Sequence, residues 1–189
     1  MSASLRGGRM PIRYVRPTKE ELLLVLLALD NYRPIKGVLR LQFMCFMYHY
    51  FGFKFVFGPC GPYSLELMES LQRLISEGLV KVYVSLDSGG SVVKTFSLTD
   101  RGRRVAAAAL DRIRSNNVLL EGVVVRRGSD VVSEMEAIKR TYYDKPPTFM
   151  LLRILRMIKD EWPYWVEADE RIRDHVEDVV EEMVPYLYG

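Results

Sequence analysis

The segment from Phe55 to Val80 constrains the fold more than any other part of the chain, because two glycine–proline pairs interrupt it. It reads FVFGPCGPYSLELMESLQRLISEGLV. Phenylalanines at alternate positions from Phe53 onward predict a short strand before the interruption. The prolines disfavour continuation of a strand or a helix, and Gly61 can take the positive φ that a tight turn needs. The chain is therefore expected to turn a sharp corner at Gly61, Pro62, Tyr63 and Ser64.

A helix is predicted directly after this corner. Ser64 is a suitable N-cap, the helix runs from Leu65 to Glu77, and Gly78 ends it. Its apolar residues recur at helical spacing, which predicts one buried face. That face consists of Leu67, Met68, Leu71, Leu74 and Ile75.

Two helices are predicted before the corner. Thr18 and Glu21 form a capping box ahead of the run ELLLVLLALD. This run is apolar nearly all round, so the first helix is expected to be largely buried. The residues NYRPIKG break it, and a second apolar helix is expected from Val38 to Gly52, with the glycine as its stop.

A β-hairpin and a fourth helix are predicted after the corner. The runs LVKVYVSL and SVVKTFSL favour strands, and the sequence DSGG at residues 87–90 is a hairpin turn signal. Thr99 can cap the next helix, and Asp100 favours its positive end. The segment from Val118 to Gly128 is ambiguous, because its β-branched residues favour a strand whereas its place between helices favours a helix.

Further helices are predicted towards the C-terminus. Two segments with helical spacing flank Pro146-Pro147, and their apolar positions are Val131, Met135, Ile138 and Tyr142, then Phe149, Leu152, Leu155 and Ile158. A last helix after Pro163 has the apolar positions Ile172, Val176, Val179, Val180, Met183 and Leu187. Since so long an amphipathic helix needs packing, we expect it to pack on the helix before it and to form a homodimer.

The order of these elements predicts an α+β protein: a winged helix-turn-helix with an α-helical C-terminal extension. The corner then redirects the chain between a supporting helix and the helix that precedes the wing. The expected division is a basic N-terminal arm over residues 1–17, a winged-helix domain over residues 18–117 and the extension over residues 118–189.

The segment from Leu22 to Gly102 resembles the YwgA-like family and the phage-associated SocA/Panacea-like family. Both have an aromatic extended segment, a Gly-Pro corner, a helix with paired leucines and a hairpin closing in an aromatic-x-Leu-Thr-x-x-Gly sequence. The matching residues are Phe55, Gly61, Pro62, Tyr63, Ser64, Leu71, Leu74, Gly78, Leu79, Phe96, Leu98, Thr99 and Gly102. The resemblance implies the fold more than a biochemical task, since the second family includes antitoxins and proteolysis adaptors.

Composition indicates a cytoplasmic protein. Apolar residues make up 49% of the chain, enough for a core, and no apolar run approaches the roughly 18 residues that cross a membrane. The N-terminus lacks the apolar stretch of a secretory signal, and two cysteines do not make a disulfide framework. Two glutamines and three asparagines are few, which is typical of a thermophilic source.

The net charge of +3 is unevenly distributed along the chain. Residues 1–104 carry 15 basic and 8 acidic side chains, whereas residues 159–189 carry 3 basic and 10 acidic ones. The two ends are therefore expected to face each other or to have different partners. The C-terminal acids are either the solvated face of an amphipathic helix or a docking surface for a basic partner.

Double-stranded DNA is the partner that the winged-helix prediction favours. In that fold the helix before the wing enters the major groove, where Gln72 and Arg73 are its suitable base readers. Carboxylates such as Glu66 and Glu69 on the same face oppose phosphate binding. We therefore assign most of the binding to cations elsewhere in the chain. The N-terminal arm, which either lies on DNA or is a solvated tail, contributes some of them, and the hairpin and the start of the fourth helix contribute the others. These cations are Arg6, Arg9, Arg13, Arg16, Lys94, Arg101, Arg103 and Arg104.

The sequence thus predicts a DNA-binding transcriptional regulator, with a non-catalytic protein-interaction module of the antitoxin or adaptor kind as the alternative. No phosphate-loop, dinucleotide, hydrolase or metalloprotease motif occurs, so neither catalysis nor a cofactor is expected. Cys45, His49 and Cys60 together would suffice as zinc ligands. The apolar neighbours of Cys45 favour core packing instead, and no metal is expected.

Overall fold

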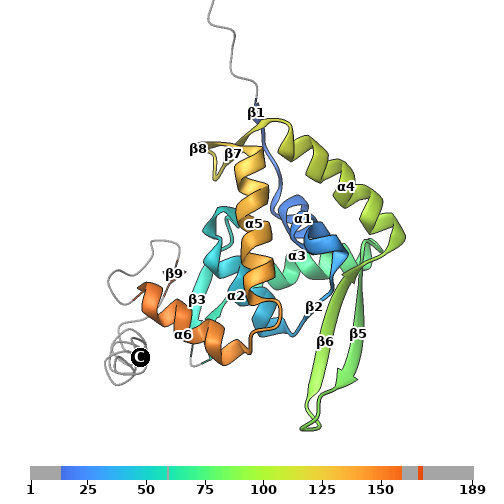
Figure 1. The fold of residues 1–189 in the computed structure, drawn as a ribbon, viewed down its shortest axis with the longest axis vertical. Coiled ribbons are helices and arrows are strands. Elements are labelled where there is room, and N and C mark those ends of the chain that lie inside the picture. The colour runs from blue at the N-terminus through green and yellow to red at the C-terminus, as the bar shows by residue number, and fades with distance from the viewer. Residues whose placement is uncertain (1–13, 59, 159–165, 168–189) are drawn as a thin grey trace, which may run out of the picture.

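The computed structural model describes residues 14–58, 60–158 and 166–167, which form a mixed α+β protein with small sheets, as predicted (Figure 1). The helices are α1 (Lys19–Tyr32), α2 (Val38–Met47), the 3-10 helix η1 (His49–Phe51), α3 (Leu65–Ser76), α4 (Asp100–Arg114), α5 (Gly128–Tyr142) and α6 (Pro147–Ile158). The strands are β1 (Tyr14–Val15), β2 (Ile35–Lys36), β3 (Phe55–Gly58), β4 (Gly61–Tyr63), β5 (Val80–Leu86), β6 (Val92–Leu98), β7 (Asn117–Leu120), β8 (Val124–Arg127) and β9 (Val166–Glu167).

The described strands form three sheets of three strands each. Their orders are β1-β7-β8, β2-β6-β5 and β4-β3-β9. Strand β2, for which the sequence carries no prediction, pairs antiparallel with β6 through Ile35 opposite Phe96 and Lys36 opposite Thr95. The β5–β6 hairpin, here called the wing, projects beyond the helices (Figure 1).

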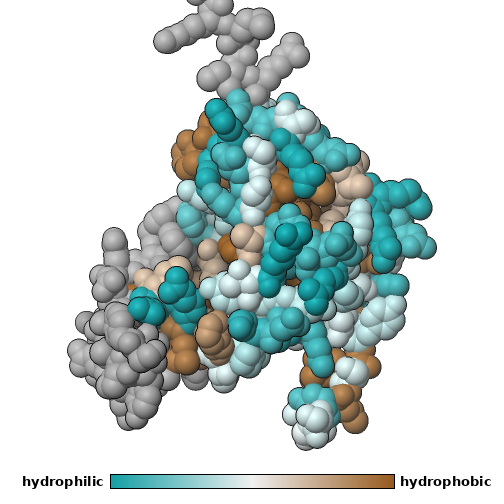
Figure 2. Space-filling model, in the orientation of Figure 1, coloured by the Kyte–Doolittle hydropathy of each residue, from teal (hydrophilic) through white to brown (hydrophobic). Residues whose placement is uncertain are grey.

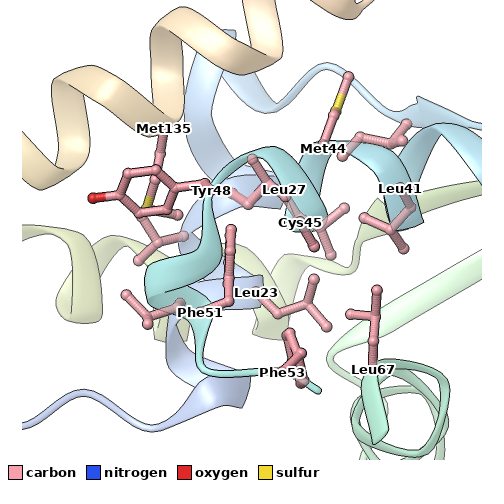
Figure 3. Packing of buried hydrophobic residues seen from close by; sticks show 14 of the residues in the cluster. Leu23, Leu27, Leu41, Met44, Cys45, Tyr48, Phe51, Phe53, Leu67 and Met135 are labelled. Carbon is pink, nitrogen blue, oxygen red and sulfur yellow. The ribbon is translucent and has the colours of Figure 1, made fainter. Parts of the chain in front are cut away.

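Helix α1 forms the centre of the core, because every residue from Leu22 to Leu29 is buried. The predicted capping box is confirmed: Thr18 Oγ1 accepts a hydrogen bond from the Glu21 amide at 3.1 Å, and Glu21 Oε2 accepts one from the Thr18 amide at 2.9 Å. One cluster of buried apolar side chains extends from Leu22 to Ile158, and Figure 3 shows part of it. Helix α5 contributes to this same cluster by packing on α1 and α4.

The C-terminal end of α1 leaves the right-handed helical conformation and is closed by a lysine from α5. Asp30, Asn31 and Tyr32 all have positive φ. The Lys139 side chain is fully buried, and its Nζ donates to the Leu27 carbonyl at 3.0 Å and to the Leu29 carbonyl at 2.7 Å. These carbonyls lie near the C-terminal end of a helix, where the helix dipole favours a positively charged group.

Helix α2 is shorter than predicted. It ends at Met47, and a separate 3-10 turn, η1, follows before the chain reaches Gly52. Tyr48 adopts φ −117° and ψ 76°, which is not helical and separates the two elements. Gly52 is still a stop, since it takes the left-handed conformation with φ 72° and its amide donates to the His49 carbonyl at 2.8 Å.

The corner lies earlier than predicted, because the chain turns between Gly58 and Gly61, which lie opposite each other, and Gly61, Pro62 and Tyr63 form strand β4. Gly61 has φ 101°, so its predicted positive φ is confirmed. The phenylalanines at positions 53, 55 and 57 are buried, as their alternation predicted. Gln42 of α2 fixes the corner from inside: its side chain accepts from the Ser64 amide at 2.9 Å and donates to the Ser64 carbonyl at 3.1 Å.

The boundaries of α3 and α4 agree closely with prediction. Ser64 Oγ accepts from the Leu67 amide at 3.2 Å, and Gly78, with φ 68°, ends α3. The Leu79 amide then donates back to the Leu74 carbonyl at 2.9 Å, which completes a Schellman motif. Thr99 caps α4 by accepting from the Gly102 amide at 2.9 Å.

The ambiguous segment after α4 is a second hairpin, formed by β7 and β8. Its strands place Leu120 opposite Val124, and Glu121 and Gly122 both have positive φ in the turn between them. Buried Val118 and Leu120 alternate with less buried neighbours, as is typical of a strand. Of the two alternatives for this segment, the strand that its β-branched residues favoured is therefore the one observed. The first part of the predicted helical extension is therefore a hairpin.

Helices α5 and α6 lie where they were predicted, on either side of the Pro146-Pro147 break. The buried face of α6 differs from the prediction, since it contains Met150 and Ile154 whereas Phe149 is exposed. This face packs on α2. The last predicted helix and its apolar positions lie outside the described residues.

Candidate functional site

Helix α3 presents a polar face with two exposed carboxylates to solvent. The predicted apolar face is confirmed, because Leu67, Leu71 and Leu74 are buried and Met68 and Ile75 pack against the core. The exposed residues of the helix and its C-cap are Leu65, Glu69, Gln72, Arg73, Ser76 and Glu77. Ser70, by contrast, is buried, and its hydroxyl donates to Glu20 Oε1 of α1 at 2.9 Å.

Glu66 bridges the first residue of α1 and the linker between η1 and β3. Its Oε1 accepts from Lys19 Nζ at 2.7 Å, and its Oε2 accepts from the Lys54 amide at 3.2 Å. Partial burial opposes ionisation of this carboxyl, but these two donors outweigh it and lower the pKa of Glu66. Lys19 is therefore neutralised by a carboxylate of α3 and adds little to any attraction for an anionic partner.

Arg73, one of the two predicted base readers, is also held by the protein itself. Its guanidinium lies 2.5 Å from Glu20 Oε1 and 2.8 Å from Ser70 Oγ. Burial opposes ionisation of Glu20, but hydrogen bonds from Arg73 and Ser70 lower the pKa of that carboxyl. Gln72, the other predicted base reader, is exposed, and its neutral side chain is not held by an ion pair as Arg73 is.

The arginines at the start of α4 are exposed and partly ordered by local contacts. Arg101 donates to the Glu77 carbonyl at 3.0 Å, which joins the start of α4 to the end of α3. The Arg103 guanidinium lies 5.2 Å from the centre of the Tyr32 ring. Arg104 is exposed as well. These three predicted residues thus gather at one end of α4.

Of the four predicted arm arginines, Arg16 is described, and Arg6, Arg9 and Arg13 lie outside the described residues. Arg16 stacks on Tyr14, with its guanidinium 5.4 Å from the ring centre, and donates to the Tyr14 hydroxyl at 3.2 Å. Tyr14 belongs to β1, which runs parallel to β7. The predicted arm therefore joins the folded part of the chain at the edge of a sheet.

A cleft of about 1050 Å³ lies between the start of α1, the η1–β3 linker and the β7–β8 turn. Its apolar lining includes Leu22, Phe51 and Phe53. Cationic and carboxylate side chains both line it, among them Arg16 and Glu20. Charges of both signs at one opening do not favour an anionic ligand over a cationic one.

The wing exposes large apolar side chains that sequence analysis did not single out. Tyr83, Val84, Leu86 and Val92 are 54%, 65%, 68% and 67% exposed. Figure 2 shows this apolar surface on the projecting hairpin. Leu86 lies directly opposite Val92, and Val84 lies opposite Lys94, so one face of the wing carries an apolar strip beside a cation. The signal was present in the sequence as apolar residues on both sides of the turn, at Val84 and Leu86 before it and Val92 after it.

The candidate zinc ligands do not come together in the described residues. Cys45 is buried in the core and Cys60 is exposed. Burial raises the pKa of the Cys45 thiol, whereas metal binding requires the thiolate. No group of three potential ligands close enough to hold a metal occurs in the part of the chain that the structure describes.

No protein-family model matches the chain, and no curated protein matches it. No helix within the described residues is long and apolar enough to cross a membrane.

Proposed function

We propose that the chain is a non-catalytic protein-interaction module built on a winged helix-turn-helix framework. The docking surface in this proposal is the apolar strip of the wing, formed by Val84, Leu86 and Val92. The cation of Lys94 lies beside the strip, so the partner is an extended segment with apolar side chains and a carboxylate.

The order of elements supports the framework. Helix α1, strand β2, helices α2 and α3, and the wing follow one another, and β2 pairs with β6 so that β6 is the central strand of the wing sheet. A winged helix is expected to have this strand order, with its first strand beside the last. The extra hairpin formed by β3 and β4 lies between α2 and α3 and replaces a short turn.

Exposure of the apolar strip carries the functional proposal. Isolated exposed apolar residues are ordinary, but contiguous ones on a projecting element indicate a binding surface. Leu86 and Val92 face each other across the strands, and Val84 is two residues from Leu86 on the same face. On α3, by contrast, Glu69 and Glu77 are exposed while Arg73 is neutralised by Glu20. That surface repels phosphates.

Selection of displayed peptides tests the proposal directly. A random peptide library on phage is selected against the full chain, and bound peptides are then titrated against the combined variant Val84→Ser, Leu86→Ser and Val92→Ser. We expect at least a tenfold loss of affinity for the variant. A matched control, Val123→Ser, removes an even more exposed valine from the β7–β8 turn and should leave affinity unchanged. Equal binding to the triple variant, or failure to enrich any peptide, rejects the proposal.

Binding of duplex DNA is the second candidate function. The observation that favours it is the exposed group formed by Arg101, Arg103 and Arg104 at the start of α4, with Lys94 exposed on the adjoining hairpin. Cations in this position would contact phosphates rather than base edges, which predicts weak sequence preference and strong dependence on salt. A titration with duplex DNA at several salt concentrations tests this candidate.

A further inference from the structure

Among the described residues, β5 forms an edge of the wing that is open along its whole length, whereas β2 pairs with β6 at Thr95 and Phe96. In the sheet order β2-β6-β5, strand β6 has a neighbour on each side whereas β5 has one neighbour. Among the described residues no strand pairs with the outer side of β5. The backbone along that side is therefore available for pairing with another strand.

The hydrogen bonds of the wing show which residues face this edge. The Lys94 carbonyl accepts from the Gly37 amide at 2.8 Å, so the backbone of Lys94 points towards β2 and away from β5. Its partner Val84 is therefore in a non-hydrogen-bonded pair and directs its own N–H and C=O outwards. The same alternation of inward- and outward-facing backbone groups holds at both ends of the wing. There the Asp87 amide donates to the Ser91 carbonyl, and the Thr99 amide donates to the Leu79 carbonyl. The outward-facing residues of β5 are Val80, Val82, Val84 and Leu86.

Nothing along β5 prevents strand pairing. Exposed edges are usually protected by proline, by charges or by a bulge. Strand β5 contains no proline, its single charged residue is Lys81, and its register with β6 is continuous from Val80 opposite Leu98 to Leu86 opposite Val92. A regular, seven-residue apolar edge of this kind is a template for another strand.

We infer that β5 pairs antiparallel with β5 of a second copy of this chain, about a two-fold axis at Tyr83. The result is a continuous six-stranded sheet that contains both wings. This inference goes beyond the proposed function, because it uses the backbone edge of β5 and leaves the apolar face of each wing free for a different partner.

The sequence of β5 is self-complementary in this register. A two-fold axis perpendicular to the sheet keeps the same face of both copies on the same side. Val82 then lies opposite Val84 of the partner subunit, and Val80 lies opposite Leu86 of the partner subunit, so all outward-facing backbone groups are paired. Lys81 lies opposite Ser85 of the partner subunit, which keeps the two lysines from facing each other. The two apolar strips become one surface.

Sedimentation of the full chain across a range of concentrations tests the inference. We expect a reversible dimer for the unmodified protein and a monomer for Val84→Pro, because proline removes an outward amide that makes no bond to β6. The control Val92→Thr reduces the same apolar face but lies on β6, and it should remain dimeric. Thermal melting of each variant establishes that it is folded. If Val84→Pro does not fold, the cysteine experiment below replaces it.

A cysteine at the axis provides the independent measurement. In a Cys60→Ser background, Tyr83→Cys places two thiols in a non-hydrogen-bonded pair, where Cα atoms are about 4.5 Å apart and a disulfide fits. With diamide as the oxidant, we expect a covalent dimer for Tyr83→Cys and none for Val93→Cys, which lies on the same face of β6. A monomeric unmodified protein at about 100 μM overturns the inference. So does equal crosslinking at both positions, or a Val84→Pro dimer, which would place the interface elsewhere.

Discussion

At the scale of single residues, Lys139 is a buried amine that links stability to pH. Burial is the main cause that lowers the pKa of Lys139, to about 7; Arg33 lowers it further, whereas the carboxylates of Asp30 and Glu136 oppose the shift. In an unfolded chain the lysine pKa is about 10.4. Above pH 7 the unfolded chain therefore binds more protons than the folded one, so the free energy of unfolding rises with pH.

We predict that the free energy of unfolding rises by about 1 kcal/mol from Lys139 between pH 7 and pH 8. Urea denaturation at the two pH values measures it. In Lys139→Met this rise should be absent, although the Leu27 and Leu29 carbonyls then lose their donor. The control Lys145→Met removes an exposed lysine and should keep the rise. An equal pH dependence in Lys139→Met would show that other groups cause it.

Gly61 is constrained by its φ and by its neighbours together. A Cβ at this position would lie 2.8 Å from Leu151 Cδ1 and 3.1 Å from the Phe43 ring. We predict that Gly61→Val lowers the free energy of unfolding by about 1–3 kcal/mol from backbone strain, with a further loss from overpacking. Gly90→Val at the tip of the wing is the matched control, because Gly90 also has positive φ but would meet no atom within 4 Å. Chemical denaturation should show the larger loss for Gly61→Val, and equal losses would contradict the packing argument.

At the scale of elements, the attachment of α4 to the wing depends on a close backbone approach. A Cβ at Gly102 would lie 1.9 Å from the Leu79 carbonyl oxygen. In an ordinary helix, replacing glycine by alanine stabilises by roughly 0.5–1 kcal/mol. We predict the opposite sign for Gly102→Ala, a loss of about 1–3 kcal/mol measured by thermal or chemical denaturation, since α4 must move away from the start of β5. A stabilised Gly102→Ala would mean that this contact relaxes without cost.

The elements with strong local signals were predictable, and those set by distant partners were not. Thr18, Ser64 and Thr99 identified three helix starts because an N-cap acts on amides within its own turn. Strand β2 is two residues long and exists through its pairing with β6, so no local pattern indicated it. Likewise, the bridges from Arg73 to Glu20 and from Lys19 to Glu66 join residues about 50 positions apart and follow only from the packing of α3 beside α1.

At the scale of the whole molecule, the cations are divided between neutralised and exposed groups. Those beside α3 are paired, because Lys19 binds Glu66 and Arg73 binds Glu20. The start of α4 has exposed arginines, and the sequence of the predicted arm contains further arginines. If duplex DNA is bound, its phosphates are therefore expected to lie near the arm and α4 rather than along α3.

The salt dependence of DNA binding distinguishes these surfaces. Each phosphate that a protein neutralises adds about 0.9 to the slope of log affinity against log salt. Replacing Arg6, Arg9, Arg13 and Arg16 together by alanine should lower this slope by about two to four and weaken all duplex sequences alike. Replacing Glu66 and Glu69 by glutamine should tighten binding if α3 enters the groove, because it removes like-charge repulsion. We expect no tightening, since the exposed cations lie elsewhere. If the arginine variant leaves the slope unchanged and the glutamine variant gains affinity, DNA contacts α3. If neither variant changes binding, neither the arm nor α3 contacts DNA, and the exposed Arg101, Arg103 and Arg104 at the start of α4 must supply the contacts.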